Sequence, residues 1–169
     1  LCYSGSGEIV FHAAALAIVQ SKGQGTQRFL QGVHFDDIIS FTMHPSGEIF
    51  ATGDECKASP KVVVWNALDM KVLSTLIGTH KEGICLLAFN PKGDLLASVG
   101  LDAENTLMVH DWKTGVCLTQ TSTDRCKLSA LTFMSERNNI ISLVSASENN
   151  LKFWQIRGQN VQCQQAIWG

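Results

Sequence analysis

The chain has 169 residues, of which 45% are hydrophobic and 17% are charged, as is typical of a folded globular protein and not of a disordered one. Its 13 Lys and Arg side chains nearly balance its 15 Asp and Glu, so the formal net charge of −2 gives no general attraction to nucleic acid or to an anionic membrane. The longest apolar stretch near the start, residues 9–19, is well short of the roughly 20 residues that a membrane-spanning helix needs. We therefore expect neither nucleic acid nor a membrane as a partner.

Six scattered cysteines form no CxxC pair, which favours a reducing, intracellular compartment. The apolar stretch at 9–19 has no basic region before it, and the chain starts at Leu1. This pattern indicates a piece of a longer chain instead of a secretory signal.

Short apolar segments alternate with turn residues along the whole chain. Strands are predicted at 8–11, 15–19, 27–30, 38–43, 49–52, 62–65, 72–76, 84–89, 95–99, 107–110, 116–119, 128–133, 140–145, 151–154 and 161–165. Turn-forming residues stand between them, for example at 91–94, 102–105 and 113–115. The longer loop 53–61, which carries Pro60, is expected to project from the fold, and loops of this kind often carry function.

The segments repeat. A copy that starts at Met43 matches one that starts at Phe89, 46 residues later, and a weaker copy starts at Phe133 after another 44 residues. A period near 45 with four short strands per copy is typical of propeller blades, whereas helical repeats would show a 3.6-residue period. We expect an all-β propeller fragment of about four four-stranded blades. The expected divisions are a partial first blade at 1–33 and further blades at 34–79, 80–123 and 124–169.

Polar residues recur at fixed places in these blades. A His before the first strand, a Ser or Thr on the second and a Trp on the third can hydrogen-bond in series, which satisfies polar groups that would otherwise be buried unpaired. His34, Thr52 and Trp65 take these places in one blade. His80 and Ser98 take two of them in the next, where His110 replaces the Trp. Trp154 takes the third place in the last blade, which begins at Asp124 without a His.

Several motifs resemble the echinoderm microtubule-associated protein-like family, a family of WD-repeat β-propellers. They are His34–Ile39, Ala51–Gly53, Leu96–Thr106, Asp111–Lys113, Arg28–Leu30 and Leu151–Trp154. The resemblance implies a larger, double propeller that associates with microtubules or tubulin, and hence a place in the cytoplasm on the cytoskeleton. WD-repeat proteins of cilia and flagella share much of the pattern, so an axonemal location is a near alternative.

Catalytic and metal-binding interpretations find little support. Only one of the five His residues lies three to five residues from another His or from a Cys, namely His80, five residues before Cys85, and the second such pair that a metal site favours is absent. A cation site or a reactive thiol at Asp54–Cys56 is less favoured than a solvated loop. The Gly-rich segments 4–7 and 23–25 lack a P-loop Lys and are interpreted as hairpin turns. We therefore expect no enzyme and no cofactor.

Trp112 and Trp168 are interpreted as exposed and are candidate contact residues, because aromatic side chains are enriched at interface cores. Trp168 packing within a blade is an equally good alternative. Four basic residues of the last blade could meet an acidic surface such as that of tubulin, although solvated charge is the simpler interpretation. They are Arg125, Lys127, Lys152 and Arg157.

The function expected from these observations is a non-catalytic scaffold associated with tubulin or microtubules. The alternative is a generic WD-repeat scaffold for other protein complexes that never touches tubulin. Open blade edges also predict self-association, because unpaired strand edges can pair with another copy.

Overall fold

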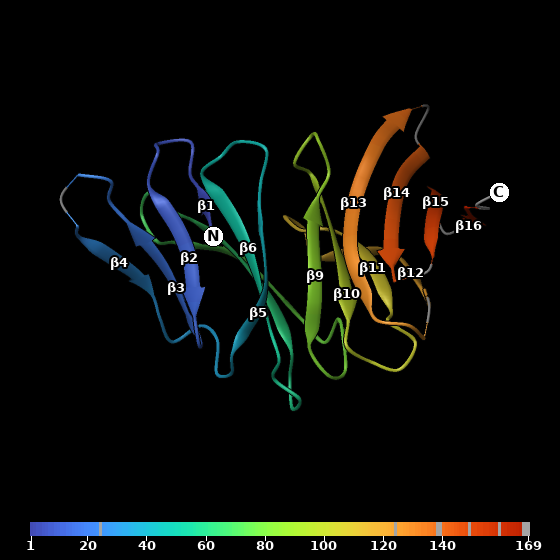
Figure 1. Cartoon of the computed structure of the whole chain (residues 1–169), viewed down its shortest axis with the longest axis horizontal. Helices are drawn as coiled ribbons and strands as arrows, with labels where there is room; N and C mark the ends of the chain where they lie inside the picture. Colours follow the sequence, from blue (N-terminus) through green and yellow to red (C-terminus); the bar gives the residue numbers. More distant parts are fainter. Residues whose placement is uncertain (24, 124, 138–139, 149, 159, 167–169) are drawn as a thin grey trace.

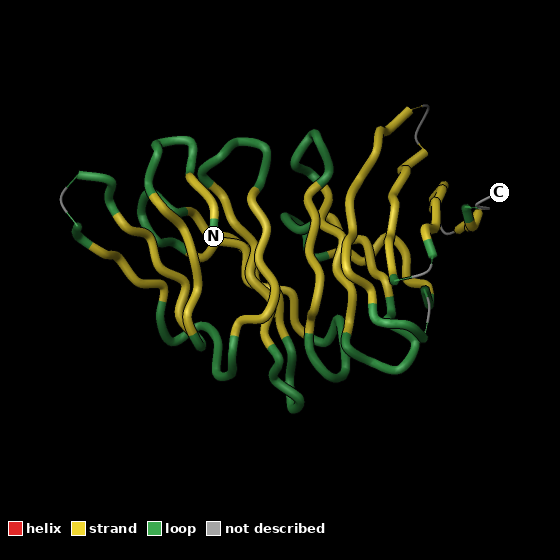
Figure 2. The backbone as a smooth tube through the Cα atoms, in the orientation of Figure 1, coloured by secondary structure: helices red, strands yellow, loops and turns green. Residues whose placement is uncertain are grey.

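In the computed structural model of this chain, the residues described are 1–23, 25–123, 125–137, 140–148, 150–158 and 160–166. Strands and loops account for these residues, and no helix occurs among them (Figure 2). None of this part of the chain therefore forms a helix that is long and apolar enough to cross a membrane.

The strands form four antiparallel sheets of four strands each, in chain order (Figure 1). The first sheet contains β1 (Cys2–Tyr3), β2 (Ile9–Ala13), β3 (Leu16–Gln20) and β4 (Gln27–Leu30). The second contains β5 (Ile38–Met43), β6 (Ile49–Asp54), β7 (Lys61–Asn66) and β8 (Val72–Ile77). The third contains β9 (Ile84–Phe89), β10 (Leu95–Gly100), β11 (Leu107–Asp111) and β12 (Val116–Thr121). The fourth contains β13 (Leu128–Arg137), β14 (Ile140–Ser147), β15 (Leu151–Arg157) and β16 (Asn160–Gln165).

These four sheets confirm the predicted all-β fold of propeller blades. The first strands of three successive sheets contact each other in order, β5 with β9 and β9 with β13, as the inner strands of neighbouring blades should. β1 was not predicted because it contains only two residues, too few to show a pattern. It nevertheless pairs with β2 and gives the first sheet its fourth strand.

Apolar side chains fill the space between each pair of neighbouring sheets, in three separate clusters. Val19 and Leu30 of the first sheet pack with Phe50 and Trp65 of the second, while Val64 faces the third sheet. A third cluster joins the third and fourth sheets. Because the two middle sheets are covered on both faces, their central strands are continuous apolar runs instead of alternating ones.

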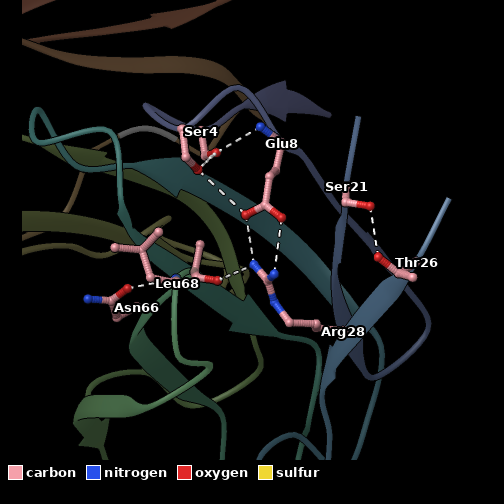
Figure 3. A network of polar contacts seen from close by, with 9 residues as sticks. Ser4, Glu8, Ser21, Thr26, Arg28, Asn66 and Leu68 are labelled. Atoms are coloured by element: carbon pink, nitrogen blue, oxygen red, sulfur yellow. Dashed lines mark hydrogen bonds and ion pairs between the residues drawn. The ribbon is translucent and has the colours of Figure 1, made fainter. Parts of the chain in front are cut away.

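Polar contacts also connect the first two sheets. Arg28 on β4 donates from Nη1 to Glu8 Oε1 over 3.0 Å and from Nη2 to Glu8 Oε2 over 2.7 Å (Figure 3). The same Nη2 donates to the carbonyl oxygen of Ala67, which follows β7, over 2.9 Å. The two-pronged ion pair lies within the first blade and orients the Arg28 guanidinium, because a guanidinium and a carboxylate match in geometry, and the bond to Ala67 then joins the first blade to the second.

Candidate protein-binding face

Connections of two kinds emerge at the same end of the sheets. The first kind joins successive blades, and the second kind joins the second and third strands within a blade. Both lie at one end because every second connection in an antiparallel sheet returns to the same end. We call the surface made by residues 31–37, 55–60, 78–83, 101–106, 122–123 and 125–127 the loop face. The loop between β6 and β7 extends farthest at the lower edge of Figure 1, as expected for the predicted projecting loop.

The loops of this face pack against one another and form a continuous surface. Gly83 lies between two of them, so that a Cβ added there would be 3.1 Å from Glu55 Cα and 3.1 Å from Leu101 Cδ1. Gly83 has a φ of +133°, and the close approach leaves no room for a side chain.

A buried polar network supports the loop face in the second blade. His34 Nδ1 lies 2.8 Å from Asp54 Oδ2, and His34 Nε2 lies 2.8 Å from Thr52 Oγ1. Asp54 also accepts a hydrogen bond from the backbone N–H of Lys61, at 3.0 Å. The side chains of His34 and Asp54 have no exposed surface, and burial lowers the pKa of His34 despite the favourable bond to Asp54. A neutral His34 therefore donates from Nδ1 and accepts the Thr52 hydroxyl proton at Nε2.

The third blade lacks this carboxylate contact. His80 Nε2 lies 2.8 Å from Ser98 Oγ, in the same arrangement as His34 and Thr52. Gly100, however, occupies the place that corresponds to Asp54, two residues after the hydroxyl. His80 Nδ1 is buried without a hydrogen-bond partner among the described residues. Burial lowers the pKa of His80 to about 4, so its ring is neutral at pH 7.

The third-strand positions expected in this network share one register. Each of these third-strand residues pairs with the second-strand residue that lies two positions before the blade's Thr or Ser: Trp65 with Phe50, His110 with Leu96 and Trp154 with Leu143. Their hydrogen bonds differ. Trp154 Nε1 donates to Ser145 Oγ over 2.9 Å. Trp65 Nε1 and His110 Nδ1 are buried and find no partner within the part of the chain that is described, so the expected series through the Trp65 indole is not formed.

Phe35 is the most exposed aromatic side chain of the loop face. Its exposed fraction is 80%, although it directly follows the buried His34. The ammonium group of Lys61 lies 4.1 Å from the centroid of the Phe35 ring, a cation–π contact. The backbone N–H of Lys61 is tied to Asp54, so the same network anchors both partners of this stack. An aromatic ring presented on a rigid support is the kind of residue that dominates protein interfaces.

Charge is divided unevenly over the loop face. The loops at 31–37, 55–60, 78–83 and 101–106 carry mostly acidic residues: Asp36, Asp37, Glu55, Glu82, Asp102 and Glu104, against Lys57 and Lys81. The next loop, which leads into the fourth sheet, carries exposed Arg125 and Lys127, and its sequence also contains Asp124. The two zones meet at an ion pair between Arg125 Nε and Glu104 Oε1, at 3.5 Å.

The four basic residues proposed from the sequence do not form one cluster. Lys152 lies at the loop-face end of β15 and donates to the carbonyl oxygen of Thr123 over 2.9 Å, beside the loop of Arg125 and Lys127. Arg157 is the last residue of β15 and lies at the opposite end of the blade. Five residues of extended strand separate Lys152 from Arg157, about 16 Å. Arg157 is therefore removed from this group.

The expectation that Trp112 is exposed is wrong, because only 4% of its surface is accessible. Its Nε1 donates to the carbonyl oxygen of Gly93 over 2.8 Å, and its ring meets those of His44 and Phe89 edge-on. Trp112 therefore packs in the interface between the second and third blades and is not available as a contact residue. Trp168 lies outside the described residues.

The interpretation of Asp54 as part of a solvated loop is also wrong. Asp54 is the last residue of β6 and pairs with Ile38, which places its side chain under the buried ring of His34. The spacing His34, Thr52, Asp54 could have indicated this role. Phe35 and Ser145 were missed as well, since nothing in their local sequence distinguishes them from ordinary loop and strand residues.

Among the described residues, no group of three His, Cys, Asp or Glu side chains is placed to hold a metal ion. An open pocket of about 430 Å³ lies on the loop face and is lined by ten residues, which include Thr79, His80, Lys81, Asp102 and Glu104.

Comparison with known proteins agrees with this architecture. The family described as "WD domain, G-beta repeat" matches residues 70–111, which run from the end of the second blade through β11. The 77 kDa echinoderm microtubule-associated protein of Strongylocentrotus purpuratus is 28% identical over 90% of this chain and 23% of its own length. Echinoderm microtubule-associated protein-like 2 of Rattus norvegicus is 26% identical over 96% of this chain and 26% of its own length.

A ciliary protein is also similar. Cilia- and flagella-associated protein 44 of Mus musculus is 24% identical over 78% of this chain and 7% of its own length. These matches confirm the resemblance inferred from the motifs, at modest identity over most of the chain. The chain spans about a quarter of the length of the microtubule-associated relatives.

Proposed function

We propose that this WD-repeat chain is part of a non-catalytic scaffold that associates with tubulin or microtubules through its loop face. The observation that carries the proposal is the exposed Phe35 ring, held under the Lys61 ammonium on a face that a buried network supports. The names of two similar proteins supply the partner, because both are microtubule-associated proteins. The proposed location is accordingly the cytoskeleton of the cytoplasm, or the axoneme of a cilium.

The contact with an acidic partner such as tubulin is assigned to the basic end of the loop face. Arg125 and Lys127 are exposed there, and Lys152 lies beside them. Charges of this kind raise the rate of encounter with an oppositely charged surface and weaken as salt rises, because ions screen them. Phe35 lies in the loop that enters the second blade and would supply apolar contact area.

The alternative is a generic WD-repeat scaffold that assembles other proteins, ciliary ones among them, without touching tubulin. The similarity to a cilia- and flagella-associated protein favours it. The division of charge on the loop face suits either partner, because it offers an acidic zone and a basic zone side by side.

Co-sedimentation with polymerised microtubules tests the proposal. The double variant Arg125→Glu/Lys127→Glu should pellet several-fold less than the wild type at low salt. The matched control is Lys22→Glu/Lys71→Glu, two exposed lysines in turns at the opposite end of the sheets, which makes the same charge change. If both double variants pellet equally, the contact is not at the basic end of the loop face.

Self-association is a second part of the proposal. The first sheet is covered by the second on one face and the fourth by the third, and each leaves its other face for further blades or for a second copy. Sedimentation velocity of the 169-residue chain tests this. A dimer supports pairing between copies, and a compact, stable monomer contradicts it.

A further inference from the structure

The loop that enters the fourth blade is tied to the turn between β10 and β11 by three hydrogen bonds. The backbone N–H of Thr123 donates to the carbonyl oxygen of Glu104 over 3.1 Å, and the Thr123 hydroxyl donates to the carbonyl oxygen of Asn105 over 2.8 Å. The Asn105 side chain donates from Nδ2 to the carbonyl oxygen of Cys126 over 3.1 Å. The loop and the turn are therefore held together as one unit.

The turn that carries Glu104 is itself closed by Asp102. The Asp102 Oδ1 atom accepts the backbone N–H of Glu104 over 3.2 Å and the hydroxyl of Thr106 over 2.8 Å. The backbone N–H of Asn105 donates to the carbonyl oxygen of Asp102 over 2.8 Å. Asn105 has a φ of +44°, in the left-handed region that asparagine tolerates better than most residues. The backbone at Glu104 is therefore fixed before any partner arrives.

Glu104 and Arg125 face each other across this unit. Each directly precedes one of the two residues joined by the side-chain bond, Asn105 and Cys126. Arg125 Nε lies 3.5 Å from Glu104 Oε1, although the two side chains are 86% and 54% exposed. An exposed ion pair of this kind is weak by itself, but the hydrogen bonds of the backbone keep the carboxylate at a high effective concentration beside the guanidinium.

Two further cations lie beside this ion pair. Lys127 is exposed and follows Arg125 by two residues. Lys152 donates from Nζ to the carbonyl oxygen of Thr123 over 2.9 Å, which brings its ammonium group to the same loop. An acidic segment that approaches these cations therefore meets a carboxylate of the chain itself, that of Glu104, already placed at Arg125.

We propose that Glu104 is an internal competitor: its carboxylate occupies, on the Arg125 guanidinium, the place that a carboxylate of an acidic partner segment takes. The inference rests on the proposed function, because it concerns the same basic end of the loop face. Binding exchanges one carboxylate for another at Arg125, so a single carboxylate gains little. A segment with several consecutive carboxylates displaces Glu104 and also reaches Lys127 and Lys152. The competition therefore makes the basic end selective for such segments.

The test uses hexaglutamate as the probe and measures its affinity for the protein at low salt. Glu104→Gln should bind the peptide about two- to fivefold more tightly, the range expected when an exposed ion pair is released. The matched control is Glu55→Gln, which makes the same charge change in another loop of the same face and should give a clearly smaller gain. Equal gains in the two variants, or no binding of hexaglutamate by any variant, would overturn the proposal.

A double-mutant cycle locates the competition at Arg125. In the Arg125→Gln background, Glu104→Gln should give no further gain, because the competitor has lost its cation. The ¹⁵N signal of Arg125 Nε should shift when Glu104 is replaced, and it should shift in the wild type when hexaglutamate binds. A gain that persists without Arg125, or a peptide that binds without moving the Arg125 signal, would contradict an exchange at this guanidinium.

Pelleting with microtubules separates this inference from the proposed function. If the cycle with hexaglutamate gives the expected result but the protein stays in the supernatant, tubulin is not the partner and the internal competition stands. If pelleting depends on Arg125 and Lys127 but Glu104→Gln binds hexaglutamate no better than the wild type, the proposed function stands and the internal competitor is refuted.

Discussion

Asp54 is the residue on which the second-blade network depends. Its replacement should therefore lower the free energy of unfolding far more than its position beside a loop suggests. Asp54→Ala removes two hydrogen-bond acceptors at once. It leaves the Nδ1–H of His34 and the backbone N–H of Lys61 without partners, and the His34–Asp54 pair is fully buried. At about 1–3 kcal/mol for each unsatisfied buried group, the expected loss of unfolding free energy is about 3–5 kcal/mol.

Asp54→Asn provides the matched control, because it preserves shape and one acceptor. The amide oxygen can still accept from the Lys61 N–H, and the amide nitrogen then faces His34 Nδ1. His34 can adapt by moving its proton to Nε2 and donating to Thr52, whose hydroxyl can turn to the carbonyl oxygen of Val63, 3.3 Å away. The expected loss is only about 1–2 kcal/mol, the difference between a charged and a neutral hydrogen bond.

Urea unfolding followed by circular dichroism measures both variants. With a denaturant slope of about 2 kcal/mol/M, the midpoint should fall by about 2 M for the alanine variant and by less than about 1 M for the asparagine variant. The ¹⁵N spectrum of His34 should show the change of tautomer only in Asp54→Asn. If Asp54→Ala unfolds at the same urea concentration as the wild type, the buried pair does not support this blade and the argument is refuted.

Three further outcomes are expected. Folding lowers the pKa of His80 from 6.5 to about 4, so as the pH falls the unfolded chain takes up this proton before the folded chain does. The contribution of His80 to the free energy of unfolding is therefore full above pH 6.5 and should decline as the pH falls towards 4. The loss is on the order of 3 kcal/mol, measured by urea unfolding at pH 7 and pH 4.5, and His80→Gln should flatten the dependence; equal pH slopes would contradict the assignment. Trp112→Phe should destabilise by about 1–3 kcal/mol, since it removes the buried bond to Gly93 and part of a packed ring, and a thermal midpoint within 1 °C of the wild type would contradict that burial. Phe35→Ala should change the free energy of unfolding by less than about 0.5 kcal/mol, because the ring is 80% exposed, and should lower microtubule binding. A large loss of stability without a loss of binding would contradict the role of Phe35 as a contact residue.

The strands could be predicted from the sequence because each blade repeats the same local pattern. The segments at 38–43, 84–89 and 27–30 match the observed strands to the residue, and most of the others differ by one or two residues at an end. Local alternation and turn chemistry suffice here, since each strand pairs with its sequence neighbour. The two-residue β1 and the extension of β13 to Arg137 depend on pairing with β2 and β14 and leave no local signal.

The burial of individual polar and aromatic side chains was harder to predict, because it depends on residues in the neighbouring blade. Trp112 follows Asp111 in a turn-rich stretch, and turns normally lie on the surface. Its ring is covered because it packs against His44, which is 68 residues earlier in the chain. Asp54 likewise is fully buried and in contact with His34, which is 20 residues earlier in the chain. Periodicity locates strands, whereas contacts between blades require the three-dimensional arrangement.

The most direct test of the central proposal is co-sedimentation of the wild-type protein with polymerised microtubules over a series of salt concentrations. We expect the protein to pellet with microtubules at low salt and progressively less at moderate salt, because exposed charges at Arg125 and Lys127 are screened as ionic strength rises. A protein that stays in the supernatant at every salt concentration would contradict microtubule association and leave the generic WD-repeat scaffold as the better description.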